Sequence, residues 1–396
     1  MISVEQAKTT ISNSCKVKPI ITVDLLSAVG FILAEDVIAK INIPSFDNSA
    51  MDGYAIQHQD IENGITKFHI SEEVKAGDYP KDKIRTGECV PIYTGAPIPP
   101  GADSIIMAEK TTIFNEQMKI ENGYKSKKGK HIRLLGEQIR KGEVALIKGT
   151  KISPSISSYL SALGEVEIPI FSEPKIKIIT TGNEIIKAGI PLQFGQIYES
   201  NSTALIALLK EQKITKITPI IARDTTKDLL EKLQDINQYD IIILTGGISV
   251  GKYDLVADCL TEIGVEKIFH KIAQKPGKPL FFGRKKNTLI FALPGNPAAV
   301  ITSYYQYIYP TIKKMLGFEK TELEKVQLPL LQDISIKENR SNFLKGKISE
   351  KGVNILSGQG SHILSSFSKS DCFIYLPQGK KHWYKGGNVE VQILPL

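Results

Sequence analysis

The sequence is short of cysteine, tryptophan and long apolar runs, and each shortage excludes a class of protein. Its 396 residues include four cysteines and one tryptophan. No Cys-x-x-Cys pair exists, so buried free thiols are expected rather than zinc ribbons or thioredoxin-type redox sites. No apolar stretch approaches the ~20 residues of a membrane span, and the first residues lack the basic segment and apolar core of a signal peptide. We therefore expect a cytoplasmic protein with no membrane partner.

Three common motifs are also missing at the loops where they would carry function. The P-loop pattern Gly-x-x-x-x-Gly-Lys-[Ser/Thr], the dinucleotide pattern Gly-x-Gly-x-x-Gly and the nucleophile elbow Gly-x-Ser-x-Gly do not occur there. This disfavours P-loop NTPases, classical dehydrogenases and α/β-hydrolases.

The charge balance is basic but not concentrated. Lysine and arginine number 50 against 42 acidic residues, a formal net charge of +8, and the lysines are scattered along the chain. Scattered lysines do not predict a nucleic-acid partner. A basic balance does suit small anionic ligands.

Hydrophobic periodicity changes character along the chain. The first 45 residues read as helical, with Thr22 as the cap of a helix whose apolar face is Val23, Leu26, Val29 and Leu33. Residues 54–150 read as short strands between glycine and proline turns, followed by a helix over 155–164. After about residue 325 helical periodicity stops, and short strands predict a small β-sandwich or barrel.

Residues 175–316 alternate between strands and helices. The expected strands are 175–181, 216–222, 239–245, 266–272 and 288–293, and the expected helices are 202–212, 226–236, 255–263 and 297–316. Strands joined through helices of this length predict right-handed crossovers and a doubly wound parallel α/β sheet. Asn296-Pro297 is a typical start for the last helix.

The most informative stretch is 240–254, where an apolar run ends in Thr245-Gly246-Gly247-Ile248-Ser249-Val250-Gly251-Lys252-Tyr253-Asp254. One interpretation is an anion-binding loop at the carboxyl edge of a parallel sheet, where ligands of open α/β sheets bind. The other is a tight turn from strand to helix with Asp254 as the helix N-cap. The loop alone does not decide between them.

Other loops of the α/β region bring further charged side chains to the same edge. We expect convergence of the carboxylates Glu184, Asp224 and Asp254 with the lysines Lys271, Lys275 and Lys278. Carboxylates near a phosphate predict Mg²⁺, and lysines with bare backbone amides neutralise anions. Each feature also has a structural alternative: Asp224 as a helix cap, Glu184 as a solvated side chain, and residues 275–278 as an exposed turn.

Several longer motifs resemble one known family. They are residues 44–55 (Pro-Ser-Phe-Asp-Asn-Ser-Ala-Met-Asp-Gly-Tyr-Ala), 93–97 (Tyr-Thr-Gly-Ala-Pro), 180–184 (Thr-Thr-Gly-Asn-Glu), 246–251, 275–279 (Lys-Pro-Gly-Lys-Pro), 293–297 (Leu-Pro-Gly-Asn-Pro) and 359–362 (Gln-Gly-Ser-His). In this order they resemble the molybdopterin molybdenumtransferase family, which is related to the gephyrin C-terminal domain. The resemblance covers nearly the whole chain.

The resemblance implies a fold of four domains. These are an N-terminal helical and linker domain (1–45 plus 138–173), an inserted β-rich domain (46–137), an α/β domain of molybdopterin-binding type (174–320) and a C-terminal β-barrel (325–396). It also implies a homodimer whose active-site cleft is completed by the partner subunit.

The reaction implied is the Mg²⁺-dependent insertion of molybdate into adenylylated molybdopterin with release of AMP. The residues implied as catalytic are Asp52, Thr94, Glu184, Asp224, Asp254, Lys271 and Lys275. Those implied for substrate binding are Arg133, Gly246, Gly247, Ser249, Gly251, Lys278, Pro294, Gly295, Asn296 and Ser361. Glu184 and Asp254 are the expected metal ligands, and the adenylyltransferase of the same pathway is an expected protein partner.

The chain departs from the family pattern at three places. Asn183 stands where the family usually has aspartate, and Thr245 where it has serine. In the loop 133–138, Leu134 and Gln138 stand where the family usually has an arginine and an aspartate. Two other functions stay open: a molybdopterin adenylyltransferase, which shares a domain like 174–316, and a non-enzymatic scaffold like gephyrin. The flanking domains argue against the first, and the retained acidic and lysine positions argue against the second.

Overall fold

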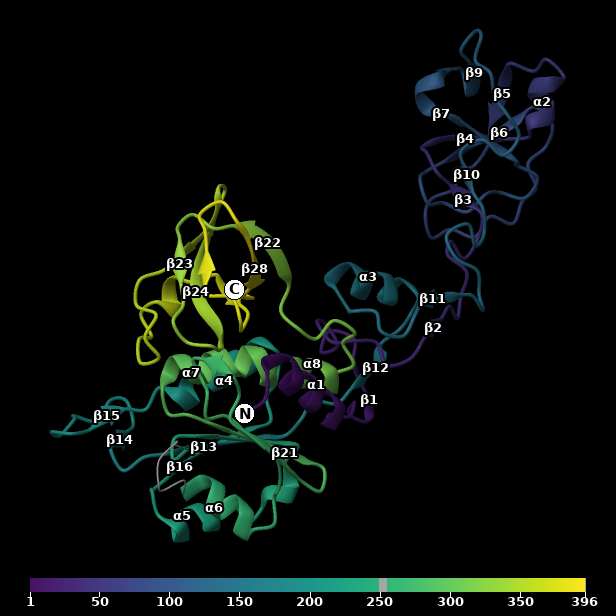
Figure 1. The fold of residues 1–396 in the computed structure, drawn as a ribbon. Coiled ribbons are helices and arrows are strands. Elements are labelled where there is room, and N and C mark those ends of the chain that lie inside the picture. Colours follow the sequence, from purple (N-terminus) through teal and green to yellow (C-terminus); the bar gives the residue numbers. More distant parts are fainter. Residues whose placement is uncertain (249–254, 396) are drawn as a thin grey trace. The chain divides into compact units, whose positions relative to one another are not determined.

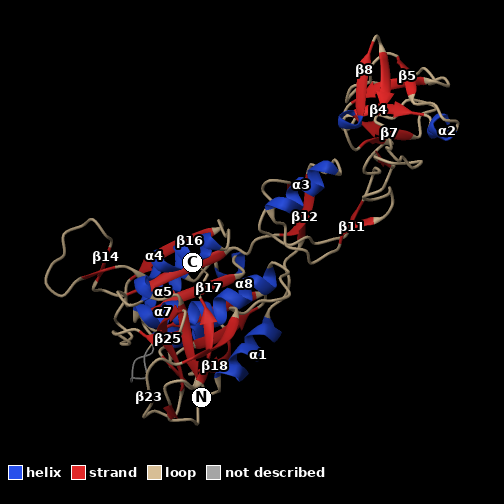
Figure 2. Ribbon diagram, turned by 90° about the horizontal axis from the view of Figure 1, so that it is seen from above, coloured by secondary structure: helices blue, strands red, loops and turns tan. Residues whose placement is uncertain are grey.

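The computed structural model describes residues 1–248 and 255–395, and the chain divides into two compact units. Unit 1 comprises Met1–Thr22 and Pro169–Leu396, and unit 2 comprises Val23–Ile168. Figure 1 labels the elements of both units and Figure 2 shows which are helices and which are strands. The division into four domains stays a prediction.

Unit 1 is built around a six-stranded sheet in the order β16-β13-β17-β21-β20-β18. The strands are β13 (Ile176–Thr181), β16 (Ile217–Ala222), β17 (Ile241–Thr245), β18 (Glu266–His270), β20 (Phe281–Lys285) and β21 (Thr288–Leu293). β13, β16, β17 and β21 pair in parallel. The central strands β13, β17 and β21 are buried at every position, as a sheet covered on both faces requires.

Helices cover both faces of this sheet (Figure 1). The helices are α4 (Asn201–Glu211), α5 (Thr226–Lys232), α6 (Leu255–Glu262), α7 (Pro297–Ser303) and α8 (Tyr309–Met315), with the N-terminal helix α1 (Val4–Ser14). α5 and α6 pack on one face through a core that includes Leu229, Val256 and Leu244. α4, α7 and α8 lie on the other face. The predicted doubly wound α/β domain is confirmed.

Two details of this region differ from the prediction. β20 was not predicted, and it runs antiparallel to both β21 and β18, so the sheet is mixed rather than wholly parallel. Its hairpin to β21 turns at Lys286 and Asn287, which are not glycine, and the sequence therefore gives little turn signal. The helix expected over 297–316 is interrupted by one π-helical turn over Tyr304–Ile308.

The C-terminal part of unit 1 is a second sheet. Its strands are β19 (Gln274–Lys275), β22 (Lys325–Pro329), β24 (Ser341–Ser349), β25 (Gly352–Ile355), β26 (Cys372–Leu376) and β28 (Asn388–Ile393), with a small pair β23 (Ile334–Ser335) and β27 (His382–Trp383). A bridge between Leu330 and Val353 joins the chain after β22 to β25, which closes the sheet on itself. β19 joins this sheet from the α/β region through Gln274 and Lys275, opposite Ser341 and Asn342.

Unit 2 contains a six-stranded sheet in the order β7-β4-β6-β5-β9-β8. The strands are β4 (Gly53–Ile56), β5 (Lys67–Ile70), β6 (Glu88–Ile92), β7 (Ser104–Met107), β8 (Thr111–Phe114) and β9 (Gln117–Ile120), with the short helix α2 (His58–Glu62). Two-stranded ladders join β2 (Val37–Ile38) to β11 (Val144–Leu146) and β3 (Asn48–Ser49) to β10 (Ile132–Arg133). Helix α3 (Pro154–Ala162) also belongs to unit 2, and the paired strands β1 (Ile20–Asp24) and β12 (Glu167–Phe171) contain the residues at which the chain passes from one unit to the other. A short parallel pair in unit 1, β14 (Ile185–Ile186) and β15 (Ile197–Tyr198), lies outside both of its larger sheets. The β-rich character predicted for 54–150 is confirmed.

The helix predicted from Thr22 is wrong. Residues 20–24 are strand and the next residues are turns, while the real first helix begins after Ser3, which forms a capping box with Gln6. The Asp24 carboxylate accepts the Leu26 amide at 2.9 Å and closes a turn, and Gly30 has φ of +92°. Leu26, placed on the expected apolar face, is 76% exposed. Local turn chemistry therefore overrides the helical spacing.

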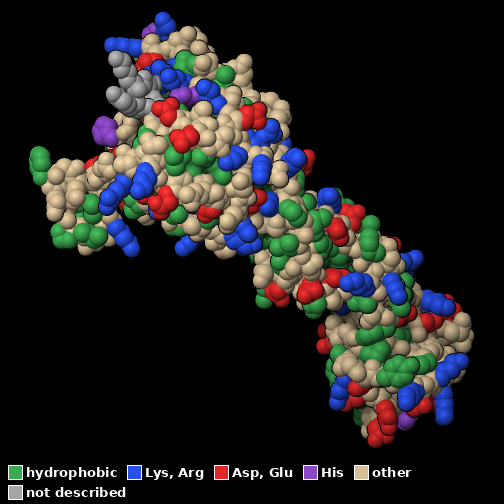
Figure 3. Space-filling model, turned by 90° about the horizontal axis from the view of Figure 1, so that it is seen from below, with side chains coloured by type: hydrophobic (Ala, Val, Ile, Leu, Met, Phe, Trp, Pro, Cys, Tyr) green, Lys and Arg blue, Asp and Glu red, His purple; other side chains and the backbone are tan. Residues whose placement is uncertain are grey.

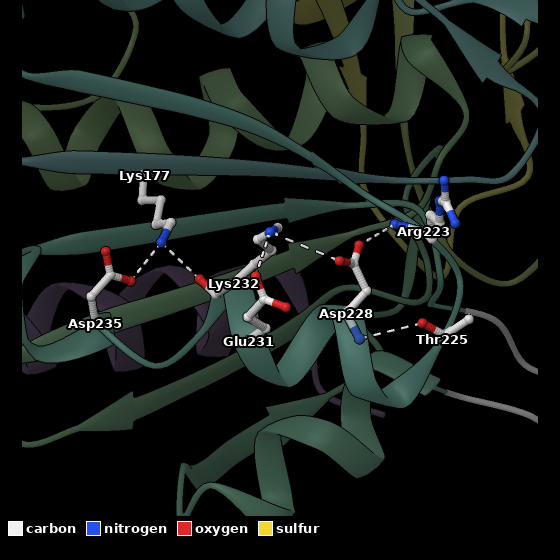
Figure 4. Close-up of polar contacts among 7 residues, drawn as sticks. All are labelled: Lys177, Arg223, Thr225, Asp228, Glu231, Lys232 and Asp235. Atoms are coloured by element: carbon white, nitrogen blue, oxygen red, sulfur yellow. Dashed lines mark hydrogen bonds and ion pairs between the residues drawn. The ribbon is translucent and has the colours of Figure 1, made fainter.

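A buried lysine joins β13 to the C-terminal end of α5, and a second contact joins β16 to the start of that helix. Lys177 is 3% exposed, and its Nζ donates to Asp235 at 2.5 Å and to the Lys232 carbonyl at 2.7 Å (Figure 4). At the other end of α5, Asp228 accepts the Arg223 amide at 2.7 Å, and the Thr225 side chain caps the helix. A buried ammonium needs such partners. The bond between Arg223 and Asp228 holds the end of β16 to the first turn of α5.

Surface charge and cysteine placement agree with the expectations from composition. On the face drawn in Figure 3, basic and acidic side chains are interspersed rather than gathered in one patch. Cys15, Cys89, Cys259 and Cys372 are buried free thiols, and burial raises the pKa of Cys89 to about 12. Among the described residues, no helix is both long and apolar enough to cross a membrane.

Candidate active site

Five loops leave the α/β sheet at one edge, because β13, β16, β17, β21 and β18 all run in the same direction. These loops carry Glu184, Asp224, the glycine-rich stretch, the three lysines and residues 294–296. For the described residues the predicted loops therefore leave the sheet at the same edge, and the gathering of their charged side chains into one site stays a prediction. Ser249, Gly251 and Asp254 lie outside the described residues.

Glycine is required where the loops after β17 and β13 meet. Gly246 has φ of +89°, and a Cβ there would lie 2.5 Å from the Thr181 carbonyl oxygen. Gly247 has φ of +62°, and its Cβ would lie 2.7 Å from Val256. The Gly246 amide donates to the Leu293 carbonyl at 3.1 Å, which ties this loop to the end of β21. The close approach leaves a floor of main chain, which can bind anions through amides.

The acidic part of the edge is assembled through Asn183. Its Oδ1 accepts the Asp224 amide at 3.2 Å, which ties the loop after β13 to the loop after β16. Glu184 and Asp224 are both exposed, and no hydrogen-bond partner of either carboxylate occurs among the described residues. The N-cap of α5 is Thr225, so the alternative role of Asp224 as that helix cap is wrong.

A chain of hydroxyl and carboxylate groups behind this edge was not found from the sequence. Thr245 Oγ1 donates to Thr180 Oγ1 at 3.3 Å, and Thr180 lies 3.5 Å from a Glu199 oxygen. Glu199 accepts the Ser202 amide and hydroxyl at 2.6 Å each, at the start of α4. The spacing of Glu199 and Ser202 at a helix start was the one available sequence signal. This network joins the ends of β13 and β17 to α4.

Residues 294–296 are held between two other segments. Asn201, at the start of α4, donates from Nδ2 to the Gly295 carbonyl at 2.9 Å. Pro297 begins α7, and the Ala298 amide donates to the Ser361 carbonyl at 3.0 Å. The C-terminal loop that carries Ser361 therefore reaches the sheet edge, as the resemblance implies.

The lysine loop, residues 271–280, is closed at its base and tied to the N-terminal segment. The Lys271 amide donates to the Leu280 carbonyl and the Ile272 amide to the Lys278 carbonyl, each at 2.9 Å. Ile2, at the N-terminus, donates to the Lys271 carbonyl at 3.2 Å. Lys271 has φ of +75°, a conformation that non-glycine residues rarely adopt. Tertiary contacts therefore hold this turn, which is not a free surface loop.

The lysines themselves are at the surface. Lys275 is exposed, and its Nζ donates to Glu338 of the C-terminal part at 2.6 Å. Lys275 holds the pKa of Glu338 below its usual range through this hydrogen bond. Lys271 and Lys278 are half-buried. The loop thus presents cations at the same edge of the sheet from which the glycine-rich loop leaves.

Asp52, Thr94 and Arg133 belong to unit 2. Asp52 accepts the Thr94 amide at 2.7 Å and the Thr94 hydroxyl at 2.8 Å. These donors hold the pKa of Asp52 below its usual value, the amide contributing more than the hydroxyl. Arg133 in β10 is exposed and lies opposite Asn48 in β3, within the motif that precedes Asp52. The fold of this unit therefore joins the motif 44–55 to two distant segments, one that carries Thr94 and one that carries Arg133.

We expect replacement of Thr94 by valine to raise the pKa of Asp52, because valine removes the hydroxyl donor and keeps the amide. A carboxyl group whose pKa is lower in the folded than in the unfolded protein stabilises the fold at pH values above its unfolded-state pKa. This stabilisation is lost as the pH falls through the folded-state pKa. The variant should lose part of this contribution. A carboxyl NMR titration of Asp52 measures the shift, with Thr94→Ser as the control that keeps a hydroxyl. Equal pKa values in both variants would contradict the assignment.

The donor set of the sheet edge fits Mg²⁺ better than a transition metal. Among residues 1–248 and 255–395, no group of three or more His, Cys, Asp or Glu side chains is placed to hold a metal ion. Mg²⁺ does not need such a cage, because it is commonly held by one or two carboxylates together with phosphate oxygens and water. The exposed carboxylates Glu184 and Asp224 beside a floor of main-chain amides supply that chemistry.

The chain matches known proteins over nearly its whole length. Three family profiles match consecutive parts: the MoeA N-terminal region (domain I and II) over residues 2–164, a probable molybdopterin binding domain over 177–314, and the MoeA C-terminal region (domain IV) over 327–394. A molybdopterin molybdenumtransferase of Haemophilus influenzae is 35% identical over 377 residues, covering 93% of this chain and 92% of the relative. One from Staphylococcus aureus is 28% identical and covers 98% and 95%.

The fold agrees with a solved structure. The crystal structure of molybdopterin biosynthesis moeA protein from Pyrococcus horikoshii OT3 matches with a TM-score of 0.83 and 29% sequence identity, covering 100% of both chains. Sequence, fold and the order of the motifs thus agree, and the chain belongs to the molybdopterin molybdenumtransferase family, a family of transferase enzymes.

Proposed function

We propose that this chain inserts molybdenum from molybdate into adenylylated molybdopterin and releases AMP, in a Mg²⁺-dependent reaction. The observation that supports this proposal most is that the loops bearing the carboxylates, the glycines and the lysines all leave the α/β sheet at the same edge. The names of the relatives support the transfer of molybdenum. We further propose a cytoplasmic homodimer, on the resemblance alone.

In the proposed reaction water attacks the phosphoanhydride of the adenylylated pterin, AMP leaves, and the pterin keeps its own phosphate. The two dithiolene sulfurs bind molybdenum in place of one oxo ligand of molybdate, which leaves with the two thiol protons as water. The Gly247 amide would bind a phosphate oxygen, and Gly246, whose own amide donates to the Leu293 carbonyl, would let the phosphate approach the main chain closely. Lys271 and Lys275 would offset the negative charge that builds on the leaving phosphate. Mg²⁺, held by Glu184 and Asp254, would polarise the phosphorus. Asp224 and Ser361 would orient the substrate at the same edge.

The remaining positions complete the proposed site. Lys278 and residues 294–296 would line the substrate pocket beside the glycine loop, where Asn201 holds the Gly295 carbonyl. Asp52, Thr94 and Arg133 are included on the resemblance. The pairing of Asp52 with Thr94 stabilises the ionised carboxylate, which would suit it to accept a hydrogen bond from the substrate.

The test is an assay of the purified full chain with adenylylated molybdopterin, molybdate and Mg²⁺, scoring AMP and metal-loaded cofactor together. We expect AMP and molybdenum-loaded pterin in equal amounts, and much less AMP without molybdate. In a parallel assay with molybdopterin and ATP, consumption of ATP with formation of adenylylated pterin would instead identify an adenylyltransferase. Substrate binding without turnover under all conditions would favour a scaffold and overturn the proposal.

A further inference from the structure

The π-helical turn between α7 and α8 places a buried tyrosine against the lysine loop. Tyr307 is 1% exposed, and its hydroxyl donates to the side-chain oxygen of Gln274, which is fully buried. Burial raises the pKa of Tyr307 well above its usual value, so the hydroxyl stays protonated as a donor. A π-turn shifts the side chains that follow it around the helix axis, and such turns often occur at functional sites.

The side-chain amide of Gln274 also contacts the main chain of the lysine loop. Its Nε2 donates to the Pro276 carbonyl at 2.9 Å and lies 3.5 Å from the Gly277 carbonyl. A Cβ at Gly277 would lie 2.7 Å from the same Nε2 and 3.0 Å from the Ser303 hydroxyl. The main chain between Lys275 and Lys278 is therefore folded closely around the Gln274 amide.

The position of the Gln274 side-chain amide depends on its hydrogen bond with the Tyr307 hydroxyl. The Gln274 oxygen is buried, so losing the Tyr307 hydroxyl would leave an acceptor with no donor, which is costly in a protein interior. The amide would then be free to rotate toward other partners. Because the Gln274 amide also holds the Pro276 carbonyl, its rotation would displace Pro276 and Gly277, and with them the flanking residues Lys275 and Lys278.

We propose that Tyr307, acting through Gln274, is a positioning residue that sets where Lys275 and Lys278 stand at the sheet edge. This rests on the proposed function for the role of the lysines, although the anchoring itself does not. The helix that carries Tyr307 begins at Pro297, directly after the loop Pro294–Asn296. One rigid segment therefore fixes two of the loops that meet at the site.

The same π-turn supplies a matched control. Tyr304 is also fully buried, but its hydroxyl donates to the Leu208 carbonyl of α4 at 2.8 Å. Tyr304→Phe and Tyr307→Phe therefore each remove one buried hydroxyl from the same turn. Only the second removes a contact to the lysine loop.

The experiment compares these two variants by hydrogen exchange and by steady-state kinetics of the full chain. Tyr307→Phe should speed exchange of the Lys271 and Ile272 amides, which close the base of the loop, and lower kcat by roughly 10- to 100-fold with little change in KM. Tyr304→Phe should change neither. Replacing Gln274 by methionine in the Tyr307→Phe background should not restore kcat, because the Pro276 carbonyl still lacks its donor.

Equal kcat values for the two tyrosine variants would overturn the proposal, and so would unchanged loop exchange in Tyr307→Phe. An inactive wild-type chain would count against the proposed function only. The exchange comparison would still decide whether Tyr307 anchors the loop.

Discussion

Replacing Lys275 with alanine should slow molybdenum insertion by roughly 10²–10³, the usual cost of removing one group that stabilises charge in a transition state. The lysine stands on a loop held at its base and tied to Ile2, so its ammonium is presented from a fixed backbone. The ion pair with Glu338 is partly solvated, with 50% and 37% of the two side chains exposed. Surface pairs of this kind contribute at most ~1 kcal/mol to stability. The variant should therefore stay folded while losing rate.

The matched control for this experiment is Glu338→Gln, which breaks the same ion pair and leaves the lysine in place. Its rate should stay within a few-fold of wild type. Single-turnover release of AMP measures the rate, and urea unfolding measures stability in the same samples. A Lys275→Ala variant that keeps full rate would remove this lysine from the proposed chemistry. Equal loss in both variants would show that the ion pair matters rather than the lysine's contact with substrate.

Replacing Glu184 with glutamine should raise the Mg²⁺ concentration needed for half-maximal rate by roughly 100-fold. Glutamine keeps the shape and an oxygen but removes the charge, and losing one carboxylate from a hard-cation site is expected to cost about 3 kcal/mol. Glu184 is exposed, and it is Asn183 that accepts the Asp224 amide, so the substitution removes no side-chain hydrogen bond among the described residues. Titration of Mg²⁺ in the presence of AMP measures binding apart from turnover.

Two further variants serve as a control and as a test in the opposite direction. Glu266→Gln changes an exposed carboxylate at the start of β18, the opposite edge of the same sheet, and should leave the Mg²⁺ requirement unchanged. Asn183→Asp adds a charge beside Glu184 and should lower the requirement. If Glu184→Gln titrated like wild type, the metal assignment would be wrong for this residue.

The α/β region could be predicted in detail because its signals are local. Continuous apolar runs mark β13, β17 and β21, and the residues at their ends fall in loops at one edge whatever the exact packing. The glycines at 246 and 247 were informative for the same reason, since each is required by its own backbone conformation and by close neighbours.

Where the predictions failed, a longer-range contact or a weak local signal was decisive. The spacing of Val23, Leu26, Val29 and Leu33 fits a helix, but the chain there turns at Asp24 and pairs Gly30 with the Ile152 carbonyl. The sequence did not predict β20 because the turn of its hairpin, Lys286-Asn287, has no glycine. It did not predict the π-turn because nothing in the helical spacing of 297–316 marks it.

The sequence by itself determined which residues are available for chemistry, the order of the strands along the chain and the edge of the sheet at which their loops emerge. These follow from strand direction and from backbone requirements that each residue carries locally. Only the tertiary structure decided that Tyr307 meets Gln274, that Lys275 meets Glu338 and that Ser361 reaches the start of α7. Those contacts join residues 33 to 63 positions apart. Which distant groups meet depends on how whole elements pack, and no local pattern in the chain encodes it.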